Sequence, residues 1–251
     1  VQPATVSTLS ALTPAQRERS VVLVQDAFTR YFEAPLLADL VELISRLGYQ
    51  VYLAPFSANG KPLHVQGFLS AFNRAALRNA GQLRALAEIG VPLVGLDPAM
   101  TLVYRQEYLK VPGMEQCPEV ALVQEWLLKI MPEQVGTRRD ETFRLLAHCT
   151  EKTNAPAATR QWEQVFERVG LKLATQATGC CGMSGTYGHE ARNRETSAVI
   201  YEQSWAKQIE APVEKGEALA TGYSCRSQVK RQADRQLRHP LQVVLETLRT
   251  A

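Results

Sequence analysis

The chain has 251 residues, of which 45% are hydrophobic and 21% are charged. This is the composition of a globular protein large enough for one large core or two smaller domains, without low-complexity segments or a need for disulfides. The formal net charge is only +3, and the most basic stretch, residues 230–238, has helical spacing and carries an Asp, so a solvated helix face is favoured over a nucleic-acid patch.

Strands and helices are predicted to alternate in the first part of the chain. The apolar run SVVLVQ (20–25) predicts a buried strand, and the next segment predicts a helix that ends at Gly48. A second strand (49–55), a long helix (67–89) and a third strand (91–98) follow. Because the strands are continuously apolar, we expect a parallel sheet covered on both faces.

The same order begins again after a helix predicted at 117–131. Strands are expected at 142–148, 171–178 and 217–222, with helices at 158–170 and 189–210 and two closing helices. The predicted fold class is therefore α/β, with two tandem Rossmann-like halves whose parallel sheets are flanked by helices, an internal duplication. We divide the chain into a linker (1–18), a first half (19–112), a helical connector (113–140) and a second half (141–251).

Equivalent positions of the two halves differ in their cysteines. Asp26 follows the first strand of one half as Cys149 follows that of the other. The loop ANG (58–60) matches CCG (180–182), and Met100 matches Cys225. Wherever the second half has a cysteine, the first half has another residue.

Four cysteines, Cys149, Cys180, Cys181 and Cys225, each lie just beyond the carboxyl end of a predicted strand. These ends of a parallel sheet face one crevice, so the thiols can converge there. Four thiolates suit an iron-sulfur cluster or a tetrahedral zinc ion. The glycines of TGCCGMSGTYGHE, Gly182 among them, permit tight turns and a close approach of backbone N–H groups. A buried apolar role remains the alternative for any one cysteine, and it is favoured for Cys117.

Three further side chains could support the site. His148 and His189 could bind or shield the metal, although a lone histidine more often has a structural hydrogen bond. Arg226 could balance an anionic cluster, with an ordinary surface salt bridge as the alternative. We expect all three, with Gly182, beside the ligands and not among them.

The motifs GCCGMSGTYGHE (179–190) and ATGYSCRSQ (220–228), preceded by a strand that ends at His148 and Cys149, resemble the cysteine-rich CCG domain. That domain occurs in heterodisulfide reductases, in the iron-sulfur proteins of glycerol-3-phosphate and glycolate oxidases, and at the C-terminus of large FAD-linked oxidases. The likeness is strongest to the last group, which includes D-2-hydroxyacid dehydrogenases such as D-lactate dehydrogenases, and it covers nearly the whole chain from about residue 20.

The chain departs from this family at three places. The family has a CCGRPL-like loop and an EPSC-like strand end in its first half, where this chain has ANGKPL (58–63) and DPAM (97–100). The resemblance therefore implies a first half that has lost its cysteine ligands and serves as a scaffold. The family often has CxxC at the last strand, where Gly222 stands three residues before Cys225, so a four-cysteine site is expected and a five-cysteine site is not.

The resemblance implies an electron-transfer domain of a flavin-linked 2-hydroxyacid dehydrogenase or oxidase, with a 4Fe-4S cluster on Cys149, Cys180, Cys181 and Cys225. The expected partners are FAD-binding and ferredoxin-like domains of the same protein or complex, because this segment has no flavin or CxxCxxC signature. The fragment alone is not expected to be catalytic. A structural or docking domain with zinc or no metal is one alternative, and a thiol/disulfide redox site is another.

The expected location is a reducing cytoplasm, with membrane association only through a partner. The cysteine count of five is odd, which argues against a disulfide framework. The sequence contains no apolar run of about 18 residues, so no transmembrane helix is expected. The N-terminal residues do not resemble a signal peptide. The first residue is not Met, which suggests a processed chain or an excised fragment.

Overall fold

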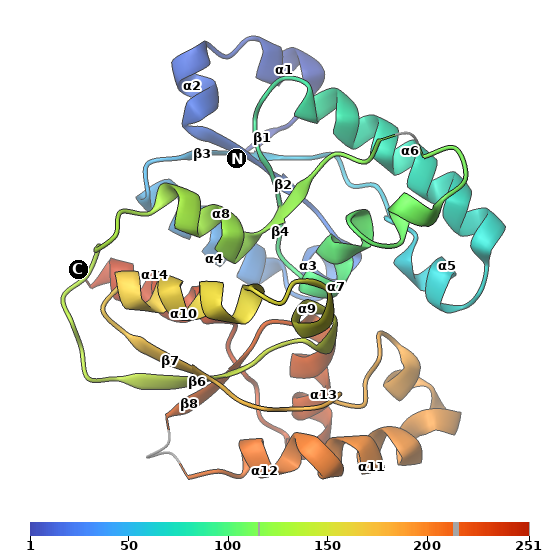
Figure 1. The fold of residues 1–251 in the computed structure, drawn as a ribbon, viewed down its shortest axis with the longest axis vertical. Coiled ribbons are helices and arrows are strands. Elements are labelled where there is room, and N and C mark those ends of the chain that lie inside the picture. Colours follow the sequence, from blue (N-terminus) through green and yellow to red (C-terminus); the bar gives the residue numbers. More distant parts are fainter. Residues whose placement is uncertain (115, 213–215, 251) are drawn as a thin grey trace. The chain divides into compact units, whose positions relative to one another are not determined.

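A computed structural model describes residues 1–114, 116–212 and 216–250, which form two compact units, Val1–Trp126 and Leu127–Ala251 (Figure 1). Both units consist of parallel strands flanked by helices, which confirms the predicted α/β class with two tandem halves. No helix of the described residues has the length and apolarity needed to cross a membrane.

Unit 1 contains a five-stranded parallel sheet in the order β1-β3-β2-β4-β5. In register, Val22 of the central strand pairs with Tyr52 on one side and Leu93 on the other. All five residues of β2 are buried, so both faces of the sheet are covered. Its strands are β1 (Gln2–Pro3), β2 (Ser20–Val24), β3 (Gln50–Leu53), β4 (Leu93–Gly95) and β5 (Val120–Leu122).

The longer helices of unit 1 bury apolar faces in the core of the unit. In α4, for example, the buried residues Leu36, Leu40 and Leu43 recur at helical spacing, and Gly48 adopts a left-handed φ of 82° just after the helix end. The helices are α1 (Val6–Ser10), α2 (Pro14–Glu18), α3 (Ala27–Tyr31), α4 (Ala34–Arg46), α5 (Lys61–Val65), α6 (Leu69–Ala87), α7 (Pro98–Thr101), the short 3₁₀ turns η1 (Leu102–Tyr104) and η2 (Tyr108–Lys110), and α8 (Val123–Ile130), which continues into unit 2.

Unit 2 contains a three-stranded parallel sheet in the order β7-β6-β8. Figure 1 shows α10 and α14 on one side of this sheet and α11 and α12 on the other. The elements are β6 (Thr142–Leu146), α9 (Cys149–Asn154), α10 (Ala158–Arg168), β7 (Lys172–Thr175), η3 (Tyr187–His189), η4 (Ala191–Asn193), α11 (Arg194–Ser204), α12 (Ala206–Ile209), β8 (Glu217–Ala220), α13 (Tyr223–Ala233) and α14 (Pro240–Arg249).

The two units share one strand arrangement. In each, the first strand of the repeat (β2 or β6) lies in the middle, the second pairs on one side and the third on the other. The chain therefore changes direction across the sheet between the first and third strands. Such a switch point is where open parallel sheets bind ligands.

Two predicted helices differ from the structure. Residues 117–131 do not form one helix, because Val120–Leu122 are buried and pair with β4, so the helix begins only at Val123. The helix expected at 189–210 is divided into two 3₁₀ turns and the helices α11 and α12. Residues 1–18, which we expected to be a linker, contain β1, paired with β3, and the helices α1 and α2.

Candidate functional site

The four cysteines of unit 2 follow its three strands. Cys149 is the first residue of α9, separated from the end of β6 by two residues, and Cys225 lies in the first turn of α13, after β8. Cys180 and Cys181 lie in the loop after β7. Since the strands are parallel, all four residues lie at the carboxyl end of the sheet. Cys149 and Cys225 follow β6 and β8, the two neighbouring strands that form the switch point.

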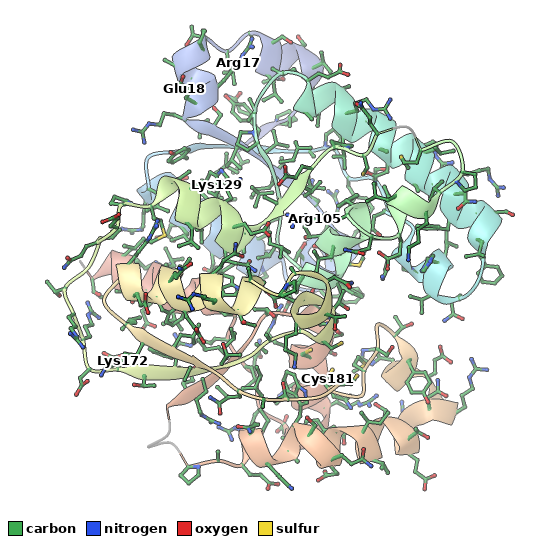
Figure 2. The ribbon with its side chains drawn as sticks, viewed as in Figure 1. Arg17, Glu18, Arg105, Lys129, Lys172 and Cys181 are labelled. Carbon is green, nitrogen blue, oxygen red and sulfur yellow. The ribbon has the colours of Figure 1, made fainter. Side chains whose placement is uncertain are left out.

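The four thiols form one connected network. The thiols of Cys149 and Cys181 donate hydrogen bonds to Sγ of Cys180, and Cys181 also hydrogen-bonds with Cys225. Cys181 and Cys225 are only 3% and 1% exposed and belong to a core cluster of this unit, whereas Cys149 and Cys180 are partly exposed. The network thus has a buried side and an accessible side. Cys181, on the buried side, is labelled in Figure 2.

Electrostatics concentrate negative charge on one sulfur. Hydrogen bonds from Cys149 and Cys181, supported by the Gly182 N–H at 3.3 Å, lower the pKa of Cys180 to about 2. The same hydrogen bonds, together with burial and the charge of Cys225, raise the pKa of Cys149 and Cys181 well above the usual range. After the first proton leaves, the remaining thiols need a nearby cation before they ionise.

Gly182 fixes the shape of the loop that carries the adjacent cysteines. Its φ is +88°, and a Cβ there would lie 2.3 Å from the Ser197 carbonyl oxygen. Ser197 Oγ donates to the Gly182 carbonyl oxygen at 2.8 Å, and Gln228 Nε2 donates to Ser197 Oγ at 3.0 Å. Both Ser197 and Gln228 are completely buried. Sequence reasoning did not single out these two residues, although Gln228 stands three positions after Cys225, on the same face of α13.

The other end of the loop is held by α9 and by the end of α11. Gly179 N–H donates to Ser204 Oγ at 2.6 Å, and the Trp205 indole N–H donates to the Gly179 carbonyl oxygen at 3.2 Å. The Lys152 ammonium donates to the carbonyl oxygen and to Oγ1 of Thr178. The backbone is therefore fixed on both sides of Cys180 and Cys181.

His148 is buried beside the thiols. Its Nδ1 accepts from the Thr150 N–H at 3.1 Å, so in the neutral ring Nε2 carries the proton and donates to Ser224 Oγ at 3.3 Å. A Cβ on Gly222 would lie 2.3 Å from Cδ2 of this ring. The His148 ring thus fills the space that a side chain at residue 222 would need. The family often has another cysteine at this position, but here no side chain fits without displacing His148.

The other expected supporting residues have partners of their own. His189 Nε2 lies 3.4 Å from Ser227 Oγ, and its pKa is lowered by burial and by the charges of two arginines. Arg226 is 6% exposed and donates to the carbonyl oxygens of Ala220 and Thr221, which fixes the end of β8. It is therefore a buried residue and not one at the surface.

Cys117 lies in unit 1, packed against the core of that unit, and burial raises its pKa to about 11. This agrees with an apolar role.

The equivalent region of unit 1 is closed by other side chains. Asn59 Nδ2 donates to the Met100 carbonyl oxygen at 3.1 Å and lies 4.0 Å from its Sδ, so Asn59 and Met100 make the contact that Cys181 and Cys225 make in unit 2. Asp26, at the position of Cys149, accepts from the N–H groups of Phe28 and Thr29 and caps α3. Gly60, like Gly182, has a left-handed φ, of 78°.

The chemistry and the geometry of the thiol site differ in what they indicate about a metal. Four sulfur donors with backbone N–H support form a set that soft metals prefer. Among the residues that the structure describes, however, no group of three or more His, Cys, Asp or Glu side chains is arranged to hold a metal ion. The sulfurs are instead hydrogen-bonded to one another, with protons still held by the thiols whose pKa is raised, so metal binding would require these thiols to lose their protons.

No family model matches the chain. It is 71% identical over 243 residues to D-2-hydroxyglutarate dehydrogenase of Pseudomonas putida and 45% identical over 247 residues to that of Escherichia coli. These matches cover 97% and 98% of this chain but only 24% of each relative. The chain is also 24% identical, over 93% of its length, to 60% of one component of the anaerobic glycerol-3-phosphate dehydrogenase of E. coli. The chain is thus similar to about a quarter of proteins named as dehydrogenases, and to part of one component of a further dehydrogenase.

Proposed function

We propose that this chain is the electron-transfer part of a flavin-linked 2-hydroxyacid dehydrogenase, and that Cys149, Cys180, Cys181 and Cys225 hold an iron-sulfur cluster. The observation that carries the proposal is the connected network of four thiols at the switch point of unit 2. A bound cluster would supply one-electron transfer between a flavin and an acceptor.

The residues around the thiols support a negatively charged group. Cys225 lies in the first turn of α13, whose eleven residues direct the positive end of the helix dipole toward the site. The Gly182 N–H already points at a cysteine sulfur, and hydrogen bonds of this kind adjust the potential of a cluster. The buried side, formed by Cys181 and Cys225, would limit water, while the accessible side would leave room for a redox partner.

The relatives support the class of reaction. Similarity to proteins named D-2-hydroxyglutarate dehydrogenase, and to one component of a glycerol-3-phosphate dehydrogenase, favours oxidation of a hydroxylated substrate by the remainder of a longer protein or complex. In that arrangement the present chain takes no part in binding the hydroxyacid. Its partners would be FAD-binding and ferredoxin-like domains.

Metal analysis of matched variants tests the proposal. Iron and acid-labile sulfide are measured per chain, after anaerobic reconstitution, in the full-length parent, in Cys181→Ser and in Cys117→Ser. The parent should exceed Cys181→Ser by about four irons and four sulfides, because clusters elsewhere cancel in the difference. Cys117→Ser should equal the parent. Equal iron in all three proteins would refute the assignment, and zinc without sulfide would favour a structural or docking domain.

One contact favours a second candidate, a thiol/disulfide redox site. Cys149 and Cys180 come from different segments, hydrogen-bond to each other and are both partly exposed. Oxidation by a disulfide-class oxidant would join their sulfurs and pass two electrons and two protons to it. Thiol trapping followed by mass spectrometry distinguishes the two candidates, because a cross-linked Cys149–Cys180 peptide in the isolated, metal-free protein is expected only for the redox site.

A further inference from the structure

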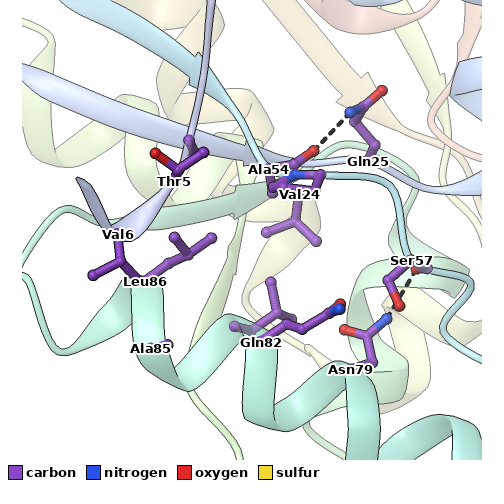
Figure 3. A pocket seen from close by; sticks show the side chains of 13 residues that line it. Thr5, Val6, Val24, Gln25, Ala54, Ser57, Asn79, Gln82, Ala85 and Leu86 are labelled. Atoms are coloured by element: carbon purple, nitrogen blue, oxygen red, sulfur yellow. Dashed lines mark hydrogen bonds between the residues drawn. The ribbon is translucent and has the colours of Figure 1, made fainter. Parts of the chain in front are cut away.

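Unit 1 contains a pocket unrelated to the thiols of unit 2. Its volume is about 260 Å³, and it lies beyond the carboxyl ends of β2 and β3, between α6 and the residues that follow β1 (Figure 3). An apolar cavity of roughly 150 Å³ is large enough to bind benzene. A substituted six-membered ring has about this size.

The walls of the pocket are mainly apolar and carry no charge. Val6, Val24, Leu83 and Leu86 line it, and none of its lining residues is ionisable. A carboxylate or ammonium placed there would lose its hydration without gaining an ion pair. The lining therefore favours an uncharged ligand.

Most polar groups around the pocket already have protein partners. Gln25 Nε2 donates to the Ala54 carbonyl oxygen at 2.7 Å, and its Oε1 accepts from Arg30. Asn79 Nδ2 donates to the Ser57 carbonyl oxygen at 2.9 Å. These bonds, two of which Figure 3 draws, hold the loop after β3 in place and give the pocket a fixed wall.

Two polar groups of the lining are left for a ligand. Neither the Ser57 hydroxyl nor the Gln82 amide has a hydrogen-bond partner within the part of the chain that the structure describes. Gln82 lies one turn after Asn79 on α6 and lines the same pocket. Together they offer both a donor and an acceptor to one polar substituent.

We infer that this pocket binds a small, uncharged, largely apolar ring compound through a carbonyl, amide or hydroxyl group that contacts Ser57 and Gln82. Apolar pockets with a few placed polar groups are the usual form of small-molecule sites. The inference does not depend on the proposed electron transfer, because none of the residues involved belongs to the thiol site.

A pair of probes of equal shape tests the charge preference. Binding of benzamide and of benzoate to the full-length protein is measured by ligand-observed NMR titration. Benzamide should bind at least tenfold more tightly than benzoate, because only the neutral amide can enter without an unpaired charge. Absence of benzamide binding up to about 10 mM, near the weak limit expected of so small a ligand, would overturn the inference, as would equal binding of both probes.

Three variants locate the binding. Gln82→Leu should weaken benzamide binding by about fivefold, the effect of one lost hydrogen bond. Val6→Trp, at a half-exposed position of the lining, should fill the pocket and abolish binding. Gln66→Leu, an equivalent change at an exposed residue outside the lining, should leave it unchanged. Unaltered binding in Val6→Trp would place the probe elsewhere and refute the site.

Discussion

Substitution of Gly222 measures how much stability is lost when a side chain at this position contacts the buried His148 ring. In the structure Gly222 has φ −89° and ψ 137°, which any residue can adopt. The cost of Gly222→Ala must therefore come from contact alone. The new Cβ would lie 2.3 Å from Cδ2, 3.0 Å from Cγ and 3.2 Å from Cβ of His148. Overpacking of this kind costs about 2 kcal/mol.

Removal of the ring should remove most of that cost. His148→Ala alone loses the cap that Nδ1 provides to the Thr150 N–H, worth about 1 kcal/mol, in addition to packing. In this background Gly222→Ala meets only the remaining Cβ at 3.2 Å, so it should cost less than about 1 kcal/mol. The coupling energy of the double-mutant cycle should be at least about 1 kcal/mol.

Urea unfolding, followed by the fluorescence of the buried Trp162 and Trp205 of unit 2, measures the cycle. Gly185→Ala is the matched control, because its φ is +66° and no atom lies within 4 Å of the new Cβ. It should be destabilised by strain alone, about equally with and without His148. If Gly222→Ala had the same cost in both backgrounds, His148 would not be the residue that requires a glycine there.

Two further changes test buried polar groups. Burial, and secondarily the charge of Asp97, raise the pKa of Asp26 from 3.8 to about 6, so the folded protein should lose about 2 kcal/mol as pH rises from 4 to 6. Asp26→Asn, which keeps an acceptor for the cap, should be more stable than the parent above pH 6 and lose this advantage near pH 4; parallel curves in urea titrations across this range would contradict the assignment. Ser197→Ala should cost about 1–3 kcal/mol, because the Gly182 carbonyl oxygen and the Gln228 amide lose a buried partner. Thr196→Ala, at the exposed neighbouring position, should be close to neutral in the same unfolding assay, and equal losses would refute the role of Ser197.

Six of the eight strands in the described residues were predictable from their apolar runs, of which Ser20–Val24 is buried along its whole length. The short strand Val120–Leu122 was not, since three apolar residues directly before a helical pattern continue its periodicity, and only pairing with β4 separates them. Tertiary contact decides such a segment.

For the site, strand ends were enough to bring the four cysteines together. The residues that shape the cysteine loop could not be predicted from strand ends, because Ser197 and Gln228 contact the loop from the helices α11 and α13. Gly222 is a similar case: its sequence position suggests a missing ligand, whereas the structure places the His148 ring in the space its side chain would need.

The proposed electron flow through the thiol site can be tested directly in the full-length protein. The flavin proposed for the full-length protein is reduced with D-2-hydroxyglutarate, the compound named in the relatives, and its reoxidation by an added one-electron acceptor is followed by stopped-flow absorbance in the parent, Cys181→Ser and Cys117→Ser. If the site carries electrons, Cys181→Ser should keep flavin reduction at the parent rate but lose at least tenfold in transfer to the acceptor, while Cys117→Ser behaves as the parent. Transfer at the parent rate in Cys181→Ser would contradict the proposed role.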